Sequence, residues 1–184
     1  MAKIYLETKR LILREFLESD IEAMFELDSN PLVHKYLGNK PISTRQQAAE
    51  GIKFVRQQYE ERGIGRFAAV EKSSGDCIGW SGLKLNAGKK ESLNNLENFI
   101  DVGYRFIPRY WGKGYATESS IATLKYGFET KNYDVIFGAA EVGNIASNKV
   151  LQKIGLKFQN KFVFEGEDIN WYELKRKDYG KAMS

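Results

Sequence analysis

The stretch Arg109-Tyr110-Trp111-Gly112-Lys113-Gly114-Tyr115-Ala116-Thr117-Glu118 decides the fold and marks a binding site. It follows a segment over 99–107, largely of alternating apolar and other residues, that predicts a strand, and it opens a segment over 115–131 that predicts a long helix. Two glycines let a backbone turn tightly and approach a ligand closely. The first amides of a helix have no internal partners, and the helix dipole is positive there. A strand, a glycine-rich turn and a helix N-terminus together predict a pyrophosphate site.

Two common phosphate-binding motifs do not fit this stretch. A Walker A loop requires G-x-x-x-x-G-K-S/T, but Lys113 is followed by Gly114 and no glycine stands five residues before Gly112. A dinucleotide fingerprint requires a third glycine where this chain has Thr117. Both classes of nucleotide-binding protein are therefore excluded.

The segments on either side of this stretch alternate strands and helices in an irregular order. Ser19 or Asp20 is expected to start a first helix, and Ser43 or Thr44 a second helix that Arg62-Gly63 ends. The expected strands cover residues 10–16, 65–71, 77–85, 99–107, 135–142, 158–164 and 169–175, and later helices cover 115–131 and 147–154. The order β-α-α-β-β-β-α-β-α-β-β predicts an α+β (mixed α/β) protein with one mixed sheet, in a single domain over 1–184.

Composition limits the cellular setting and the partners. The single cysteine, Cys77, excludes an intramolecular disulfide and fits a reducing compartment. The charged N-terminus and the lack of a long apolar stretch predict a cytoplasmic protein without a membrane partner. The net charge of +4 is spread along the chain among acidic residues, so direct nucleic-acid binding is not expected.

Three motifs together resemble the GNAT superfamily of N-acetyltransferases. Arg109-x-x-Gly112-x-Gly114 is similar to the pyrophosphate loop of that family. The block that runs from Asn144 to Leu156 is similar to the segment after the family's fifth strand, and the opening that runs from Leu6 to Arg14 resembles the RimJ/RimL-like branch. The resemblance covers nearly the whole chain.

The resemblance implies a fold and a co-substrate. The expected fold has a mostly antiparallel sheet of about seven strands with about four helices, and its fourth and fifth strands splay apart to hold acetyl-CoA. No metal is expected. The residues expected to contact the cofactor are Tyr104, Phe106, Ile107, Arg109, Trp111, Gly112, Lys113, Gly114, Tyr115, Ala116, Thr117, Asn144, Ser147 and Asn148.

Several of these side chains have a second interpretation. Arg109 and Lys113 either add positive charge at the phosphates or are solvated surface residues. Asn144 either binds the pantetheine amides or caps the helix that follows, and the two roles are compatible.

Catalysis requires a neutral amine, so a general base is expected. Asp101 stands where related enzymes often carry a glutamate base, although it is the shorter acid and is otherwise a solvent-facing strand carboxylate; Glu141 is a second candidate. The tyrosine that many GNAT enzymes place seven residues after the asparagine is Leu151 here. Ser147 is the local replacement as the acid that protonates the leaving thiolate, or it satisfies backbone amides at the helix start.

The acceptor is left open between several amines. The RimJ/RimL resemblance favours a protein N-terminal α-amine, for example on a ribosomal protein. Small amines such as polyamines, amino acids or antibiotics are an alternative, as is a non-catalytic module that senses acetyl-CoA. Tyr36, Met24, Phe25, Trp171 and Tyr172 are candidates for the acceptor site, and the protein is expected to be a monomer or a homodimer.

Overall fold

An eight-stranded sheet runs through the computed structural model, which describes residues 2–182. Its order is β1-β2-β3-β4-β5-β6-β8-β7, and β5 and β6 are parallel whereas every other neighbouring pair is antiparallel. The predicted mixed, mostly antiparallel sheet is therefore confirmed, with one strand more than expected. The strands are β1 (Ile4–Glu7), β2 (Leu11–Arg14), β3 (Arg66–Glu71), β4 (Cys77–Asn86), β5 (Phe99–Phe106), β6 (Val135–Glu141), β7 (Lys157–Phe164) and β8 (Glu167–Lys175).

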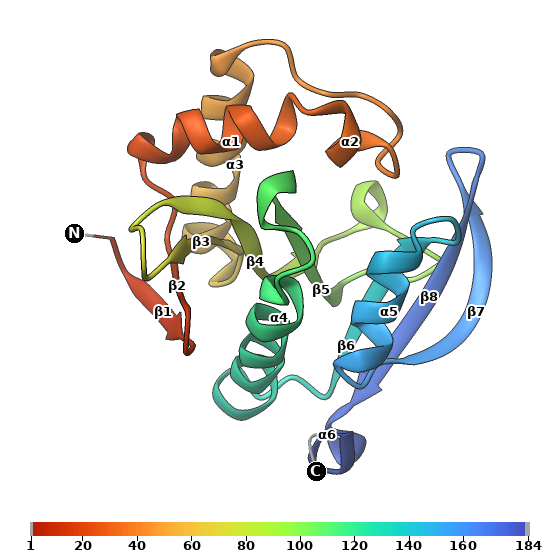
Figure 1. Cartoon of the computed structure of the whole chain (residues 1–184). Helices are drawn as coiled ribbons and strands as arrows, with labels where there is room; N and C mark the ends of the chain where they lie inside the picture. Colours follow the sequence, from red (N-terminus) through yellow and green to blue (C-terminus); the bar gives the residue numbers. More distant parts are fainter. Residues whose placement is uncertain (1, 183–184) are drawn as a thin grey trace.

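Six α-helices accompany the sheet in the described chain, and four of them have eight residues or more. The helices are α1 (Ile21–Asp28), α2 (Pro31–His34), α3 (Arg45–Arg62), α4 (Tyr115–Lys125), α5 (Ile145–Lys153) and α6 (Arg176–Ala182). Figure 1 shows α4 and α5 next to each other in front of the sheet; α4 packs on β4 and β5, and α5 on β6 and β7. The chain continues from α4 as a π-helical turn to Thr130, which accounts for the predicted helix over 115–131.

Local signals explain where most elements begin and end. Thr44 accepts a hydrogen bond from the amide of Gln47 and begins α3, and Gly63, with a φ of 63°, ends it. α1 ends at Asp28, just before Asn30-Pro31. Pro31 then begins the short helix α2, because proline suits the first helical position and the Asn30 side chain accepts the Leu32 amide at 3.0 Å.

Asp20 does not cap α1 with its side chain. Its carboxylate accepts two hydrogen bonds from the Arg14 guanidinium, at 2.7 and 2.8 Å, and one from the Leu17 amide at 2.8 Å. Asp20 is 3% exposed, so this pair joins β2 to the start of α1 in the interior.

The two halves of the sheet meet at the β5–β6 pair. β5 pairs with β4 along its whole length, with Phe99 opposite Asn86 at one end and Phe106 opposite Gly79 at the other. Its pairing with β6 is recorded at one position, where Asp101 lies opposite Phe137. Beyond that position, residues of both strands line a large pocket.

No helix within residues 2–182 has both the length and the apolar character that are needed to cross a membrane.

Candidate active site

The glycine-rich loop has left-handed backbone at both glycines. Gly112 has a φ of 73° and Gly114 a φ of 83°, a region that side chains other than glycine rarely adopt. A Cβ added at Gly112 would meet nothing within 4 Å, so the backbone angle and not crowding favours glycine there. Gly114 caps α4 without a side-chain hydrogen bond. The first amides of α4 are thus positioned for an anion.

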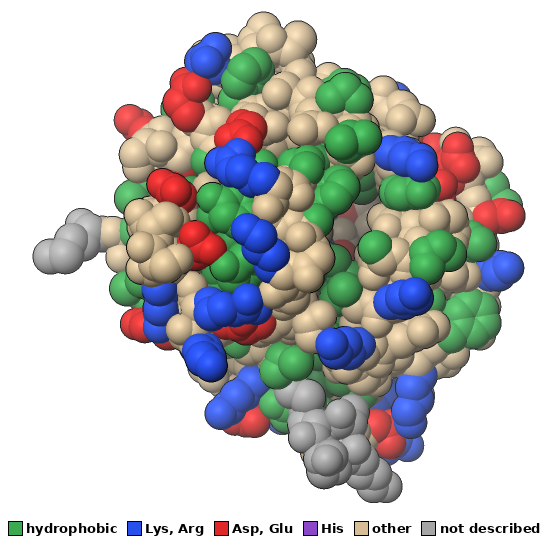
Figure 2. Space-filling model, in the orientation of Figure 1, with side chains coloured by type: hydrophobic (Ala, Val, Ile, Leu, Met, Phe, Trp, Pro, Cys, Tyr) green, Lys and Arg blue, Asp and Glu red, His purple; other side chains and the backbone are tan. Residues whose placement is uncertain are grey.

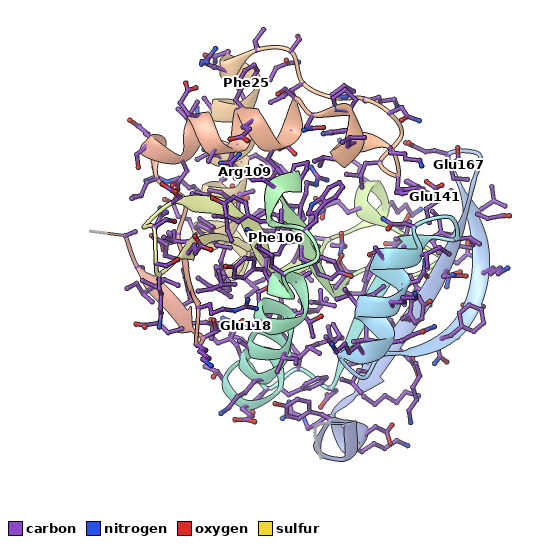
Figure 3. All side chains as sticks on the ribbon, viewed as in Figure 1. Phe25, Phe106, Arg109, Glu118, Glu141 and Glu167 are labelled. Carbon is purple, nitrogen blue, oxygen red and sulfur yellow. The ribbon has the colours of Figure 1, made fainter. Side chains whose placement is uncertain are left out.

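The N-terminal motif braces this loop. Thr8 Oγ1 donates to Glu118 at 2.6 Å, and the backbone amide and Nε of Arg10 donate to the same carboxylate at 2.8 and 2.6 Å. Arg10 also donates to the Lys113 carbonyl at 2.8 Å. Burial opposes ionisation of Glu118, but these hydrogen bonds prevail and lower the pKa of its carboxyl. Two motifs that are about 100 residues apart in the sequence therefore form one structural unit; Figure 3 labels Glu118 on α4.

A pocket of about 1460 Å³ lies beside the loop. Its walls are the ends of β5 and β6, the loop with the first turn of α4, the first turns of α5, the segment over 32–40 and the turn between β7 and β8. Figure 2 shows the molecular surface hollowed near its centre, with apolar side chains around the hollow and Lys and Arg side chains on both sides. Its size and mixed lining suit a long, partly anionic ligand.

The structure brings most of the predicted site residues to this pocket and leaves four outside its lining. The lining includes Asp101, Tyr104, Phe106, Trp111, Gly112, Gly114, Tyr115, Ala116, Thr117, Asn144 and Ser147. The residues that do not line it are Ile107, Arg109, Lys113 and Asn148.

Each of these four has another environment. Ile107 is buried in the core. Arg109 forms an ion pair with Glu26 on α1, and Figure 3 shows it on that side of the molecule. The Lys113 ammonium lies 5.1 Å from the centre of the Tyr110 ring.

Asn148 is fully engaged inside the protein. Its Nδ2 donates to the carbonyls of Glu141 and Asn144 at 2.9 and 2.8 Å. Its Oδ1 accepts from Asn170 Nδ2 at 2.8 Å and from the Tyr172 hydroxyl at 2.7 Å. An amide has two donor protons and two acceptor lone pairs, so Asn148 positions α5 against β6 and β8.

The Asp101 carboxylate has a close cationic partner. Arg66 on β3 donates to it at 2.8 Å, and Asn86 on β4 donates to its other oxygen at 3.0 Å. Gly103 makes this arrangement possible, because a Cβ at that position would lie 2.7 Å from a nitrogen of the Arg66 guanidinium. The Asp101 side chain is therefore held in place at the pocket wall by one neighbour on each oxygen.

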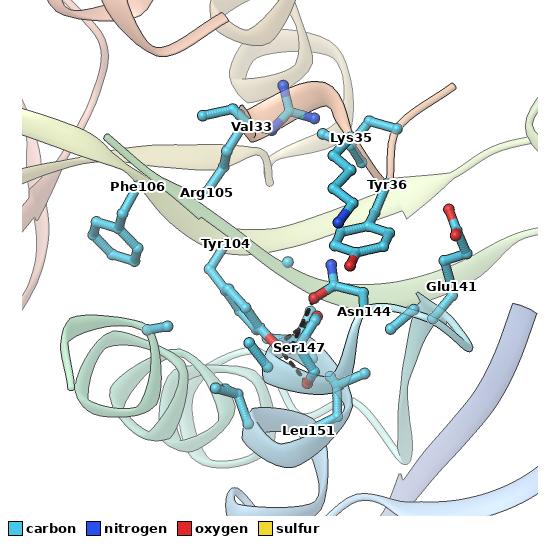
Figure 4. Close-up of a pocket in the computed structure, with 18 of the residues that line it drawn as sticks. Val33, Lys35, Tyr36, Tyr104, Arg105, Phe106, Glu141, Asn144, Ser147 and Leu151 are labelled. Carbon is cyan, nitrogen blue, oxygen red and sulfur yellow. Dashed lines mark hydrogen bonds between the residues drawn. The ribbon is translucent and has the colours of Figure 1, made fainter. Parts of the chain in front are cut away.

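A second polar group lies at the start of α5. Asn144 caps the helix, with its Oδ1 accepting the Ser147 amide at 3.1 Å, and it also lines the pocket. The Tyr104 hydroxyl lies 3.0 Å from Ser147 Oγ and 3.1 Å from the Ser147 carbonyl (Figure 4). Burial raises the pKa of Tyr104 to about 12, against the opposing effect of the hydrogen bond with Ser147. Tyr104 was expected to contact the cofactor, and a role for its hydroxyl was not anticipated.

The charges of the pocket wall are mixed, with an excess of cations. The cationic lining residues are Lys35, Lys40, Arg66, Arg105, Lys149 and Lys153, and the acidic ones are Asp101, Glu141, Glu165 and Glu167. Glu141 and Glu167 lie at the same end of β6 and β8, as Figure 3 shows. Leu32, Leu37 and Phe164, which are also part of the lining, are exposed at the mouth.

Three pocket residues escaped the sequence interpretation. Trp80 lies between two guanidinium groups, 5.5 Å from that of Arg66 and 5.1 Å from that of Arg105. Arg105 lies four residues after Asp101 in β5 and therefore on the same face of the strand, which was a usable signal. Arg66 belongs to β3, and its approach to Asp101 depends on the pairing of three strands.

Of the five candidates for the acceptor site, Tyr36 alone is part of the described pocket lining. Met24, Trp171 and Tyr172 are buried in the interior, and Phe25 lines a different, polar depression beside α1. Within residues 2–182, no group of three or more His, Cys, Asp or Glu side chains is arranged to hold a metal ion.

Comparisons with known proteins identify a family and several similar proteins. Residues 10–157 match the family model described as "Acetyltransferase (GNAT) domain". The uncharacterised N-acetyltransferase YoaA of Bacillus subtilis is 33% identical over 153 residues, which are 83% of this chain and 82% of YoaA. A GNAT-family acetyltransferase structure from Bacillus anthracis superposes with a TM-score of 0.76 at 24% identity, covering 96% of this chain and 99% of that one. RimL, a ribosomal L7/L12 alpha-N-protein acetyltransferase, superposes with a TM-score of 0.75 at 16% identity, covering 95% of both chains.

Proposed function

The chain belongs to the GNAT acetyltransferase family, whose domain implies acetyl-CoA as co-substrate, and we propose that it acetylates the N-terminal α-amine of a protein. In this proposal all 184 residues form one acetyltransferase domain. The amine attacks the thioester directly while both substrates are bound.

The proposed acetyl-CoA binding site consists of the glycine-rich loop and the ends of β5 and β6 that line the pocket. The backbone amides that run from Trp111 to Thr117 would hold the pyrophosphate, because they combine left-handed glycines with an uncapped helix start. The pantetheine arm would lie along the end of β5 toward Asn144. Lys149 and Lys153 on α5 would add positive charge at the phosphates, whereas Arg109 acts at longer range because it is paired with Glu26.

The open, apolar mouth is the observation that supports a protein acceptor. Leu32, Leu37 and Phe164 are 62%, 44% and 45% exposed beside the pocket, and an extended peptide would cover such side chains. A polyamine would favour an excess of acidic residues, but the lining has six cationic and four acidic side chains. The likeness to RimL agrees with the same acceptor class.

A general base is needed because an α-amine has a pKa near ~8 and is mostly protonated at neutral pH. Asp101 accepts hydrogen bonds from Arg66 and Asn86, one on each of its two oxygens, so both oxygens already have a partner inside the protein. Glu141 lines the same pocket, and no side-chain hydrogen bond or ion pair is found for it among the described residues. We assign the base to Glu141, acting through water, and a positioning role to Asp101.

The Glu141→Gln variant tests this assignment through pH. We expect kcat/KM for a peptide acceptor to fall about 100-fold near pH 7, since a general base typically contributes that much or more. The loss shrinks as the pH rises above the pKa of the amine, because the neutral amine then attacks without a base. Steady-state rates from pH 6.5 to 9.5 measure this. A Glu141→Gln variant with the wild-type profile, beside an Asp101→Asn variant that shows the loss, would return the role to Asp101.

Release of free thiol from acetyl-CoA, measured with a panel of amines, tests the proposed acceptor. The panel contains short peptides with serine, alanine, methionine or aspartate first, the same peptides with a blocked α-amine, free amino acids and spermidine. Transfer to free but not to blocked peptides supports the proposal. Transfer to spermidine or amino acids alone overturns it in favour of a small-amine enzyme. Tight acetyl-CoA binding without transfer to any amine identifies a sensing module.

A further inference from the structure

The position on α5 where many GNAT enzymes carry a tyrosine is apolar in this chain. Leu151 stands there, is 1% exposed, and packs over Gly138 on β6, where a Cβ would lie 2.8 Å from one of its methyl groups. The acid function cannot come from this side chain. α5 carries no hydroxyl at this position, but a tyrosine from another element places its hydroxyl against the same helix.

That hydroxyl belongs to Tyr104 on β5. The residue lies three positions beyond Asp101, past the recorded pairing with β6, and opposite Ser81 on β4. In Figure 4 its ring extends from β5 toward the start of α5, where its hydroxyl meets Ser147. Tyr104, Ser147 and Leu151 all line the pocket, so the hydroxyl pair lies at the wall that the thioester would face.

The Tyr104 hydroxyl can donate only one of its two hydrogen bonds to Ser147 at a time. A phenol has one proton, and it can be donated to the Ser147 carbonyl at 3.1 Å or to Ser147 Oγ at 3.0 Å. In the first state, the Ser147 proton is available to Tyr104. In the second state, Ser147 accepts from Tyr104, and its own proton is free to point into the pocket. The Ser147 amide is occupied by Asn144 in either state, which holds the residue in place.

We propose that Tyr104 and Ser147 form a two-hydroxyl relay that delivers a proton to the sulfur leaving the acetyl group. This inference rests on the proposed acetyl transfer. The nitrogen lone pair of the amine forms the new N–C bond, the C–S bond breaks, and its electron pair goes to sulfur. The Ser147 hydroxyl proton moves to sulfur, and the Tyr104 proton moves to Ser147 Oγ. The proton that Glu141 takes from the amine then returns to Tyr104 through water, so that all three groups regain their starting state. The products are the acetylated amine and free coenzyme A thiol.

The protonation state of Tyr104 is compatible with this role. Because burial raises its pKa to about 12, the hydroxyl keeps its proton at every pH at which the enzyme would work. A thiol has a pKa near ~8.5, so the thiolate is a tolerable leaving group and the relay contributes a moderate rather than an absolute effect. Tyr104 acts through Ser147, and it is therefore a positioning and proton-supplying residue.

The test compares Tyr104→Phe, Ser147→Ala and the double variant, using acetyl-CoA and the fastest acceptor of the peptide panel. We expect each single variant to lower kcat by about 10- to 100-fold, with the KM for acetyl-CoA within about twofold. This loss is at or below the lower limit of about 100-fold that is typical of acid catalysis, because the thiolate is already a tolerable leaving group. The double variant should be no slower than the slower single variant, because residues that act as one unit are not additive. Tyr126→Phe, which removes a tyrosine hydroxyl outside the pocket lining, should leave kcat unchanged.

The outcomes separate the relay from the reaction that it serves. If the wild-type protein transfers no acetyl group to any amine, both the proposed acetyl transfer and the relay are overturned. An active wild type whose Tyr104→Phe variant retains full kcat overturns the relay alone. Additive losses in the double variant, or a loss confined to the KM for acetyl-CoA, also overturn it, since they indicate two independent contacts with the cofactor. Calorimetric binding of acetyl-CoA and thermal unfolding verify that each variant is folded.

Discussion

Replacing Gly112 with aspartate is expected to weaken acetyl-CoA binding by about 100-fold or more, beyond detection by calorimetry at ordinary concentrations. The residue lies in the loop proposed to hold the pyrophosphate, and opposed like charges in an interface cost several kcal/mol. A side chain at this position would meet no protein atom within 4 Å, so the carboxylate would occupy open space at the anion site.

Gly112→Asn is the matched control, because asparagine has the same shape and tolerates the same left-handed backbone with a φ of 73°. Any cost of backbone strain is common to both variants, and their difference reports the charge. Equal and unchanged affinity in both variants would place the phosphates elsewhere. Equal loss in both would show that the backbone, and not the charge, matters.

Replacing Asp20 with alanine is expected to lower the free energy of unfolding by about 3–5 kcal/mol. The Asp20 side chain is 4% exposed and that of Arg14 is 15% exposed, so the change leaves a guanidinium largely buried without its partner. It also removes the acceptor of the Leu17 amide. Urea denaturation followed by circular dichroism measures the loss.

The exposed pair between Glu22 and Arg45 provides the comparison, because both side chains are more than half exposed. Glu22→Ala should unfold at the same urea concentration as the wild type. In an Asp20→Leu, Arg14→Met double variant, much of the loss should be recovered, because no charge is left unpaired. A small loss in Asp20→Ala would mean that water reaches Arg14 more readily than its burial indicates.

Most of the fold could be predicted because its boundaries carry local signals. The Thr44–Gln47 cap, the left-handed Gly63 and the turn after Glu71 each determine an element end through residues close in sequence. Three short elements were not predicted from the sequence: β1, α2 and α6, which have four, four and seven residues. Pro31 shows the reason for one miss, since proline can end one helix or begin the next, and the side chain of Asn30 decides between them.

The part of the site that consists of backbone groups could be predicted from the sequence, whereas the contacts between its side chains could not. The loop with Gly112 and Gly114 is a local motif, and its geometry follows from the glycines themselves. The partners of Asp101 come from β3 and β4, and the partner of Tyr104 comes from α5, so they depend on strand pairing and helix placement that no spacing reveals. Thr8 and Arg10 could likewise be matched to a family motif, but the reason for the motif, their hydrogen bonds to Glu118, became visible only in the structure.

The single recorded pairing position between β5 and β6 has a consequence for cooperativity. The sheet can be divided into two parts, called plates here: β1 to β5, and β6 with β8 and β7. The two plates are hydrogen-bonded to each other near Asp101 and Phe137. In the proposed binding mode, acetyl-CoA would lie between the two plates and contact both, so its binding energy would also resist their separation on unfolding. At 100 times its dissociation constant, acetyl-CoA should stabilise the protein by about 2.7 kcal/mol. Amide hydrogen exchange should slow in both plates at once.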